Sequence, residues 1–100
     1  MIEIRRTLIF DEWLKGLRDQ RASARILMRI DRMRLGLLGD IKPVGSGVSE
    51  ARVDYGPGYR VYFVKQGDVL IILLCGGDKG SQNRDISKAL ALAKELENGA

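Results

Sequence analysis

The sequence contains no histidine and a single cysteine, Cys75. The lack of histidine excludes imidazole acid–base catalysis and zinc sites built on histidine. One cysteine cannot form an internal disulfide bond, which excludes a small secreted fold held together by disulfides. No apolar run approaches the roughly 18 residues of a membrane span, and the first ten residues, MIEIRRTLIF, lack the apolar region of a secretory signal. We therefore expect a cytoplasmic protein with no metal and no cofactor.

The positive charges are distributed unevenly along the chain. Lys and Arg number 17 against 13 Asp and Glu, for a net charge of +4 over 100 residues, a length that fits one domain spanning residues 1–100. Steps of three and four residues place side chains on one helix face, and such steps connect Arg18, Arg21, Arg25, Arg29 and Arg32. Three interpretations fit this stripe: a solvated helix face, a docking surface for a nucleic acid backbone, or a docking surface for an acidic protein.

The first forty residues predict a short strand followed by two helices. Ile2 and Ile4 alternate with polar residues, as in a half-buried strand. Thr7 is the expected N-cap of a helix over Leu8–Asp19. A second amphipathic helix carries an apolar stripe from Ile26 to Leu37. Together they predict a helical hairpin packed through one face.

The second half of the chain predicts three antiparallel strands and a last helix. Residues 43–47, rich in glycine, are expected to form a loop. The expected strands are Ala51–Tyr55, Tyr59–Lys65 and Val69–Cys75, and the last helix begins between Gln82 and Asp85 with Asp85 in its first turn. The sequence therefore predicts an α+β fold in the order β-α-α-β-β-β-α.

Arg60 is the most informative residue of the predicted sheet. It lies in the middle of a strand on the same face as Tyr62. A charge in that place needs a partner, because burying it unpaired is costly. Arg60 is thus expected either to pair with Asp54 across the hairpin or to hold a phosphate with its guanidinium fork. Tyr62 is expected either to pack in the core or to stack on a base.

The run GGDKG at residues 76–80 ends the last predicted strand. It lacks the spacing of a nucleotide-binding phosphate loop, so its glycines indicate either a simple turn or room for a ligand beside Lys79. In a chain without histidine, a proton carrier must come from Lys79, Asp85, Asp54 or a tyrosine. Cys75, in an apolar run, is expected to be buried.

Two longer runs carry a family resemblance. GPGYRVYF at 56–63 and VLIILLCGGDKGSQNRDI at 69–86, together with TLIFDEWLKGLRD at 7–19, resemble the RelE/ParE superfamily of bacterial toxins, and within it the phage-derived, HigB-like "addiction module killer" branch. The resemblance implies a RelE-like toxin of a type II toxin–antitoxin system. Its partner is a cognate antitoxin, expected to be a helix-turn-helix protein from the same operon.

The resemblance also implies an activity and a set of site residues. RelE-like toxins enter the ribosome and cut mRNA by attack of a ribose 2′-oxygen on the adjacent phosphate. The resemblance implies that Arg60 of the GYR run and Lys79 are catalytic. RelE has a tyrosine near the position of Asp85, and we expect Asp85, or else Asp54, to transfer the proton. The RNA-binding residues are expected to be Arg52, Tyr62, Arg25 and Arg29. The alternatives are a ParE-like inhibitor of DNA gyrase and a non-toxic remnant that only binds its antitoxin.

Overall fold

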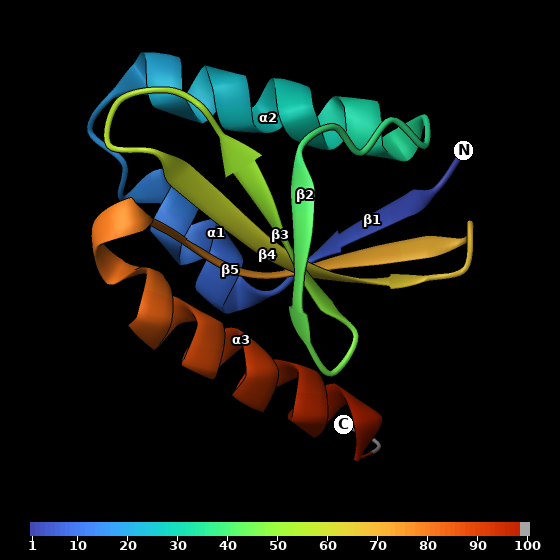
Figure 1. Cartoon of the computed structure of the whole chain (residues 1–100). Coiled ribbons are helices and arrows are strands. Elements are labelled where there is room, and N and C mark those ends of the chain that lie inside the picture. Colours follow the sequence, from blue (N-terminus) through green and yellow to red (C-terminus); the bar gives the residue numbers. More distant parts are fainter. Residues whose placement is uncertain (99–100) are drawn as a thin grey trace.

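The computed structural model describes residues 1–98 and contains one five-stranded sheet with the strand order β1-β5-β4-β3-β2 (Figure 1). The β1 strand runs parallel to β5, and the other neighbouring pairs are antiparallel. The strands are β1 (Glu3–Arg6), β2 (Ile41–Gly45), β3 (Val48–Val53), β4 (Tyr59–Gln66) and β5 (Leu70–Asp78). The helices are α1 (Leu8–Lys15), α2 (Gln20–Arg34), the short 3-10 helix η1 (Lys79–Ser81) and α3 (Gln82–Glu97). The predicted α+β class is confirmed.

Helices cover both faces of the sheet, α1 and α2 on one side and α3 on the other (Figure 1). The alternation along β4 shows the division: Tyr59, Val61 and Phe63 belong to the core under α1 and α2, whereas Tyr62 belongs to the core under α3. This agrees with the alternation expected from the sequence. Because successive strand residues point to opposite faces, Arg60 lies on the α3 face.

The glycine-rich residues 43–47, expected to form a loop, instead supply the β2 strand and a tight hairpin to β3. Ser46 and the glycines on either side of it have positive φ angles, which lets the chain reverse there. Pro43 is tolerated because β2 is an edge strand, where a missing backbone donor need not break the ladder. The antiparallel part of the sheet therefore has four strands rather than the three expected.

The first helix is shorter than the sequence suggested. Thr7 caps α1 as expected, and its side chain accepts a hydrogen bond from the Phe10 amide. The helix ends at Lys15 rather than at Asp19. Asp19 is instead the N-cap of α2, where its carboxylate accepts from the Arg21 and Ala22 amides. Within residues 1–98, no helix is long and apolar enough to cross a membrane.

Candidate functional site

Basic residues from neighbouring strands meet on the α3 face of the sheet. Arg52 of β3 lies directly opposite Arg60 of β4, and Arg60 lies opposite Gly77 of β5. Directly opposed residues of antiparallel strands point to the same face, so these three positions form one row across the sheet. Neighbouring strands are about 4.8 Å apart, so the row spans about 10 Å. Arg52 is also held at its outer end by Asp40, whose Oδ1 lies 3.0 Å from its guanidinium.

Lys79 lies beside this row, in the short η1 helix that follows β5. Lys79 and Arg60 both approach Gly58. A Cβ atom placed on Gly58 would lie 3.6 Å from the Lys79 Cβ and 3.7 Å from a guanidinium nitrogen of Arg60. Gly58 has a φ of +83°, so the turn before β4 depends on glycine here. The structure thus brings together three of the predicted site residues: Arg52, Arg60 and Lys79.

The partner of Arg60 is Glu50, a residue that the sequence analysis missed. Glu50 is 0% exposed, and its Oε1 lies 3.7 Å from Arg60 Nε. Its other oxygen accepts hydrogen bonds from the Tyr62 hydroxyl at 3.3 Å and from Gln82 at 2.8 Å. The expected pairing of Arg60 with Asp54 is wrong, because Asp54 lies past the end of β3 and lines a groove under α2. The signal was in the sequence VSEARV, whose alternation puts Glu50 and Arg52 on one face.

Asp85 lies at the β5 end of the row, in the first turn of α3. It is 8% exposed, and its Oδ2 accepts a hydrogen bond from the Ser81 hydroxyl. A Cβ on Gly77 would collide with this carboxylate, and a Cβ on Gly76 would come within 2.3 Å of the Trp13 ring. The Trp13 and Asp85 side chains therefore pack directly against these glycines, and a groove of about 560 Å³ lined by Gly76, Gly77 and Asp85 lies beside them.

Tyr62 is placed where it cannot serve as a stacking surface. The whole residue is 0% exposed, and it packs in the core between the sheet and α3. Burial raises the pKa of its phenol, and the nearby Glu50 carboxylate raises the pKa further. The proposed stacking of Tyr62 on an RNA base is wrong for this reason. Its role is to hold Glu50.

Arg25 and Arg29 lie on α2, across the sheet from Arg60. The Arg29 guanidinium donates to the backbone carbonyls of Leu38, Asp40 and Arg52, with distances between 2.7 and 3.1 Å. Burial lowers its pKa, partly opposed by Asp40. These three hydrogen bonds tie α2 to the loop before β2 and to the β3 strand, and binding of RNA by Arg29 stays a prediction. Arg25 lies over the Tyr55 ring at 4.7 Å and faces a groove that does not include Arg60.

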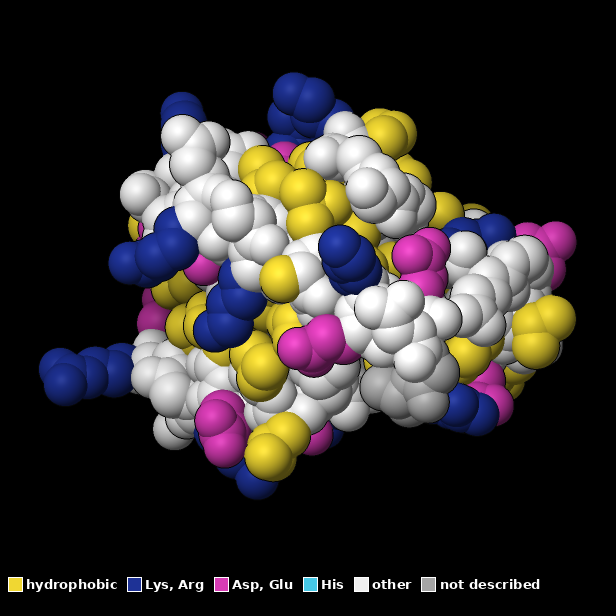
Figure 2. All heavy atoms as spheres, turned by 90° about the horizontal axis from the view of Figure 1, so that it is seen from below, with side chains coloured by type: hydrophobic (Ala, Val, Ile, Leu, Met, Phe, Trp, Pro, Cys, Tyr) yellow, Lys and Arg dark blue, Asp and Glu magenta, His cyan; other side chains and the backbone are white. Residues whose placement is uncertain are grey.

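The charges on the α3 side are mixed. Figure 2, which views the molecule from that side, shows basic and acidic side chains scattered among apolar ones. Within residues 1–98, no three acidic or cysteine side chains gather closely enough to hold a metal ion. Cys75 is buried as expected, and burial raises the pKa of its thiol to about 11. Arg52 and Arg60 are each paired with a carboxylate, and Lys79 beside them is exposed. Guanidinium groups of this kind are common partners of phosphate in proteins.

Comparison with known proteins gives a sequence relative and structural neighbours. No family model matches the sequence. A protein of Haemophilus influenzae, described as uncharacterized, is 54% identical over 95 residues, which make up 95% of this chain and 96% of that protein. Among solved structures, one chain of the toxin–antitoxin complex RelBE2 from Mycobacterium tuberculosis has a TM-score of 0.61 at 21% identity. The match covers 78% of this chain and 98% of that chain.

The structural match shows a shared fold, and the sequence match shows a shared family. At 21% identity the RelBE2 chain shows a shared fold, while 54% identity over almost the full length of both chains shows common descent. The chain thus belongs to the same family as the uncharacterized Haemophilus influenzae protein, and its fold is RelE-like.

Proposed function

We propose that this protein is the toxin of a type II toxin–antitoxin system and acts in the cytoplasm as a ribosome-dependent mRNA endonuclease. The observation that carries the proposal is the row of Arg52 and Arg60 on adjacent strands, with Lys79 beside Arg60. The RelE-like fold supports it, as does the toxin–antitoxin complex to which the structural neighbour belongs. A cognate antitoxin is the partner that this function requires.

The proposed reaction uses the 2′-hydroxyl of the RNA itself as the nucleophile. A ribose 2′-oxygen attacks the adjacent phosphorus, and the bond to the 5′-oxygen of the next nucleotide breaks. That 5′-oxygen takes a proton from water and leaves as a 5′-hydroxyl, and a 2′,3′-cyclic phosphate forms. Arg60 and Lys79 stabilise the negative charge that grows on the phosphate oxygens. Arg52 binds the backbone next to the scissile phosphate. Removing one such preorganised cation costs on the order of 100-fold in rate.

The proton that leaves the 2′-hydroxyl needs an acceptor near the row. We assign this role to Asp85, whose Oδ2 is held by Ser81 and whose Oδ1 is the oxygen that would take the proton. Glu50 is a positioning residue in this scheme, because its completely buried carboxylate pairs with the Arg60 guanidinium.

The test uses Lys79, because it is exposed and can be replaced without disturbing a buried pair. Primer extension on a reporter mRNA with purified ribosomes is run with the wild type, Lys79→Ala and the control Lys94→Ala. Lys94 is an exposed lysine in the last turn of α3, and its replacement removes the same charge. We expect discrete ribosome-dependent cuts with the wild type and Lys94→Ala, and roughly 100-fold slower cutting with Lys79→Ala. Equal cutting by all three proteins would refute the assignment of Lys79.

One observation favours a second function, inhibition of DNA gyrase. Asp85 is 8% exposed and already hydrogen-bonded, and Tyr62 is buried, so the acid–base groups near the row are poorly accessible. A binding protein needs no such group, and the RelE-like fold alone cannot decide between the two activities. If the wild type makes no cuts with ribosomes but blocks supercoiling by purified gyrase, the second function replaces the first.

A further inference from the structure

A strongly basic groove runs along α2, on the side of the sheet away from Arg60. The groove has a volume of about 660 Å³ and lies between α2 and the end of β3. Four arginines and one acid line it, for a net charge of +3. Its lining residues are Arg21, Ala24, Arg25, Met28, Arg29, Arg32, Val53 and Asp54.

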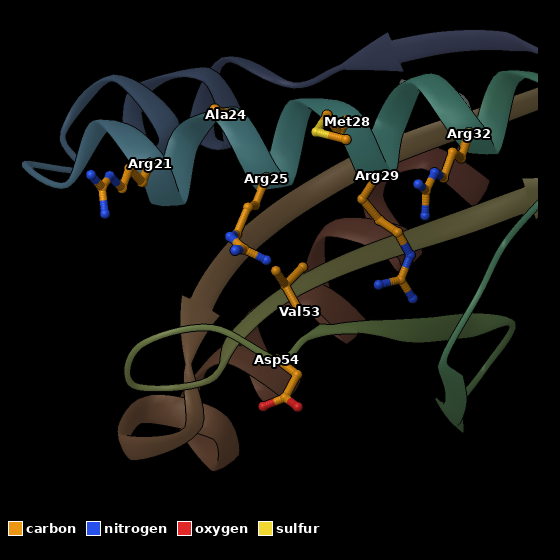
Figure 3. Close-up of a pocket in the computed structure, with 8 residues that line it drawn as sticks. All are labelled: Arg21, Ala24, Arg25, Met28, Arg29, Arg32, Val53 and Asp54. Carbon is orange, nitrogen blue, oxygen red and sulfur yellow. The ribbon is translucent and has the colours of Figure 1, made fainter.

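Most of the arginines that line the groove are not neutralised by a salt bridge within the described part of the chain. Among residues 1–98, Arg21, Arg25 and Arg32 take part in no ion pair. The one acid of α2, Asp31, pairs with Arg34 outside the groove. Like charges three and four residues apart on a helix repel one another. An acidic ligand would relieve this repulsion, and Figure 3 shows Arg25 reaching from α2 toward Val53 and Asp54, with Arg21 and Arg32 on either side of it along the helix.

The groove also carries apolar surface in the middle of its charges. Met28 is 55% exposed, and Ala24 and Val53 line the same groove. An apolar patch enclosed by charged residues is typical of a protein-binding surface, with an apolar centre and a polar rim. A nucleic acid backbone gains little from covering Met28, whereas an apolar side chain of a peptide gains from it. The Asp54 carboxylate repels phosphate and peptide carboxylates alike, so it does not distinguish the two ligands. The lining therefore favours a peptide chain over RNA.

We infer that this groove binds an acidic, amphipathic segment of a partner protein, with its carboxylates on Arg21, Arg25 and Arg32 and an apolar side chain on Met28. The arginines span positions 21 to 32, about 16 Å along the helix axis, which fits a short helix or strand. The groove and the row of Arg52 and Arg60 face opposite sides of the sheet. A partner bound in the groove thus leaves the proposed RNA site uncovered, and the inference stands whether or not the protein cuts RNA.

The test measures binding of three labelled probes to the full chain by fluorescence anisotropy. The probes are a 12-residue peptide of alternating Glu and Leu blocks at helical spacing, a 12-residue peptide in which Gln replaces each Leu, and a single-stranded oligouridylate of the same charge. We expect the first peptide to bind at least tenfold more tightly than the second. Arg21→Ala/Arg25→Ala should weaken binding of the first peptide at least tenfold. Met28→Gln should weaken it about threefold or more and leave oligouridylate binding unchanged.

The matched control is Arg5→Ala/Lys94→Ala, which removes two exposed charges far from the groove in sequence and outside its lining. It should leave peptide binding within about twofold of the wild type. If the groove variants weaken oligouridylate and peptide equally and Met28→Gln changes neither, the groove is a nucleic acid surface and the inference is wrong. Absence of peptide binding to the wild type would also overturn it. Circular dichroism of each variant verifies folding, and since Arg21, Arg25 and Met28 are exposed, all are expected to fold.

Discussion

Replacing Arg60 with alanine removes the cation that faces the buried carboxylate of Glu50. The two side chains are 12% and 0% exposed, and their charged atoms are 3.7 Å apart. Removing one partner of a buried ion pair costs about 3–5 kcal/mol, because the other charge stays buried without compensation. Glu50 keeps its hydrogen bonds from Tyr62 and Gln82, at 3.3 and 2.8 Å, which offset part of that loss. We therefore expect Arg60→Ala to lose about 3 kcal/mol of unfolding free energy, the lower end of the range.

A loss of this size is readily measured for a chain of 100 residues. It lowers the melting temperature by about 12–24 °C and the midpoint of urea unfolding by about 1–3 M. The fluorescence of Trp13, the single tryptophan, reports the transition from the core between α1 and the sheet. The slope of the unfolding free energy with urea should not change, because the native and unfolded states expose the same surface in both proteins.

The double variant Arg60→Gln/Glu50→Gln is the control, since it removes both charges together. We expect it to recover most of the loss and to lie within about 1 kcal/mol of the wild type, because a neutral pair of amides leaves no buried charge. The single variants Arg60→Gln and Glu50→Gln complete the double-mutant cycle, and the coupling between the two positions should be at least about 2 kcal/mol, since one charge left alone costs about 3 kcal/mol and the neutral pair at most about 1 kcal/mol. If Arg60→Ala unfolds at the wild-type urea midpoint, or the coupling is below about 0.5 kcal/mol, the buried ion pair does not hold Arg60 as argued.

Three further predictions concern Arg29, Gly76 and Cys75, which lie in contacts between the helices and the sheet. Arg29→Ala should cost about 2–3 kcal/mol in urea unfolding, because three carbonyls lose a charged donor, whereas Arg32→Ala on the same helix should stay within about 0.5 kcal/mol. Gly76→Ala should lower the free energy of unfolding by about 1–3 kcal/mol, since the new methyl group meets the Trp13 ring at 2.3 Å. Thermal unfolding measures this loss, and adding Trp13→Leu to the Gly76→Ala variant should recover part of it. The pKa of Cys75 is raised to about 11, so its thiol stays protonated at pH 8 and should react with a disulfide reagent only when urea unfolds the chain; fast labelling of the native protein would contradict its burial.

The buried ion pair of Arg60 and Glu50 also affects the interpretation of RNA-cutting assays on Arg60 variants. Loss of cutting by Arg60→Ala can arise from a loss of folding as well as from a loss of charge at the phosphate. Lys79→Ala avoids this ambiguity, because Lys79 is exposed and makes no ion pair within residues 1–98. The double variant Arg60→Gln/Glu50→Gln is a second test, because it is expected to fold but lacks the guanidinium. It should therefore lose RNA cutting as well.

The sequence by itself determined the features that depend on local spacing. The cap at Thr7, the buried residues Ile26, Ile30 and Met33 of α2 and the alternation along β4 follow from hydrogen-bonding groups and apolar residues a few positions apart. The predicted stripe extended too far, because α2 ends at Arg34 and Leu37 is exposed. The edge strand β2 was missed because its proline and glycines carry the local signature of a loop, while the ladder that stabilises it comes from β3.

Tertiary structure alone decided which side chains meet across those elements. Glu50 rather than Asp54 faces Arg60, because strand register aligns Arg52 with Arg60 and leaves Asp54 beyond the end of β3. Arg29, one member of a uniform arginine stripe, is tied to three carbonyls because the loop before β2 and the β3 strand come to lie beside α2. Residue type and period specify the face on which a side chain lies, but its partner depends on how distant segments align, and that alignment is decided by packing of the whole chain.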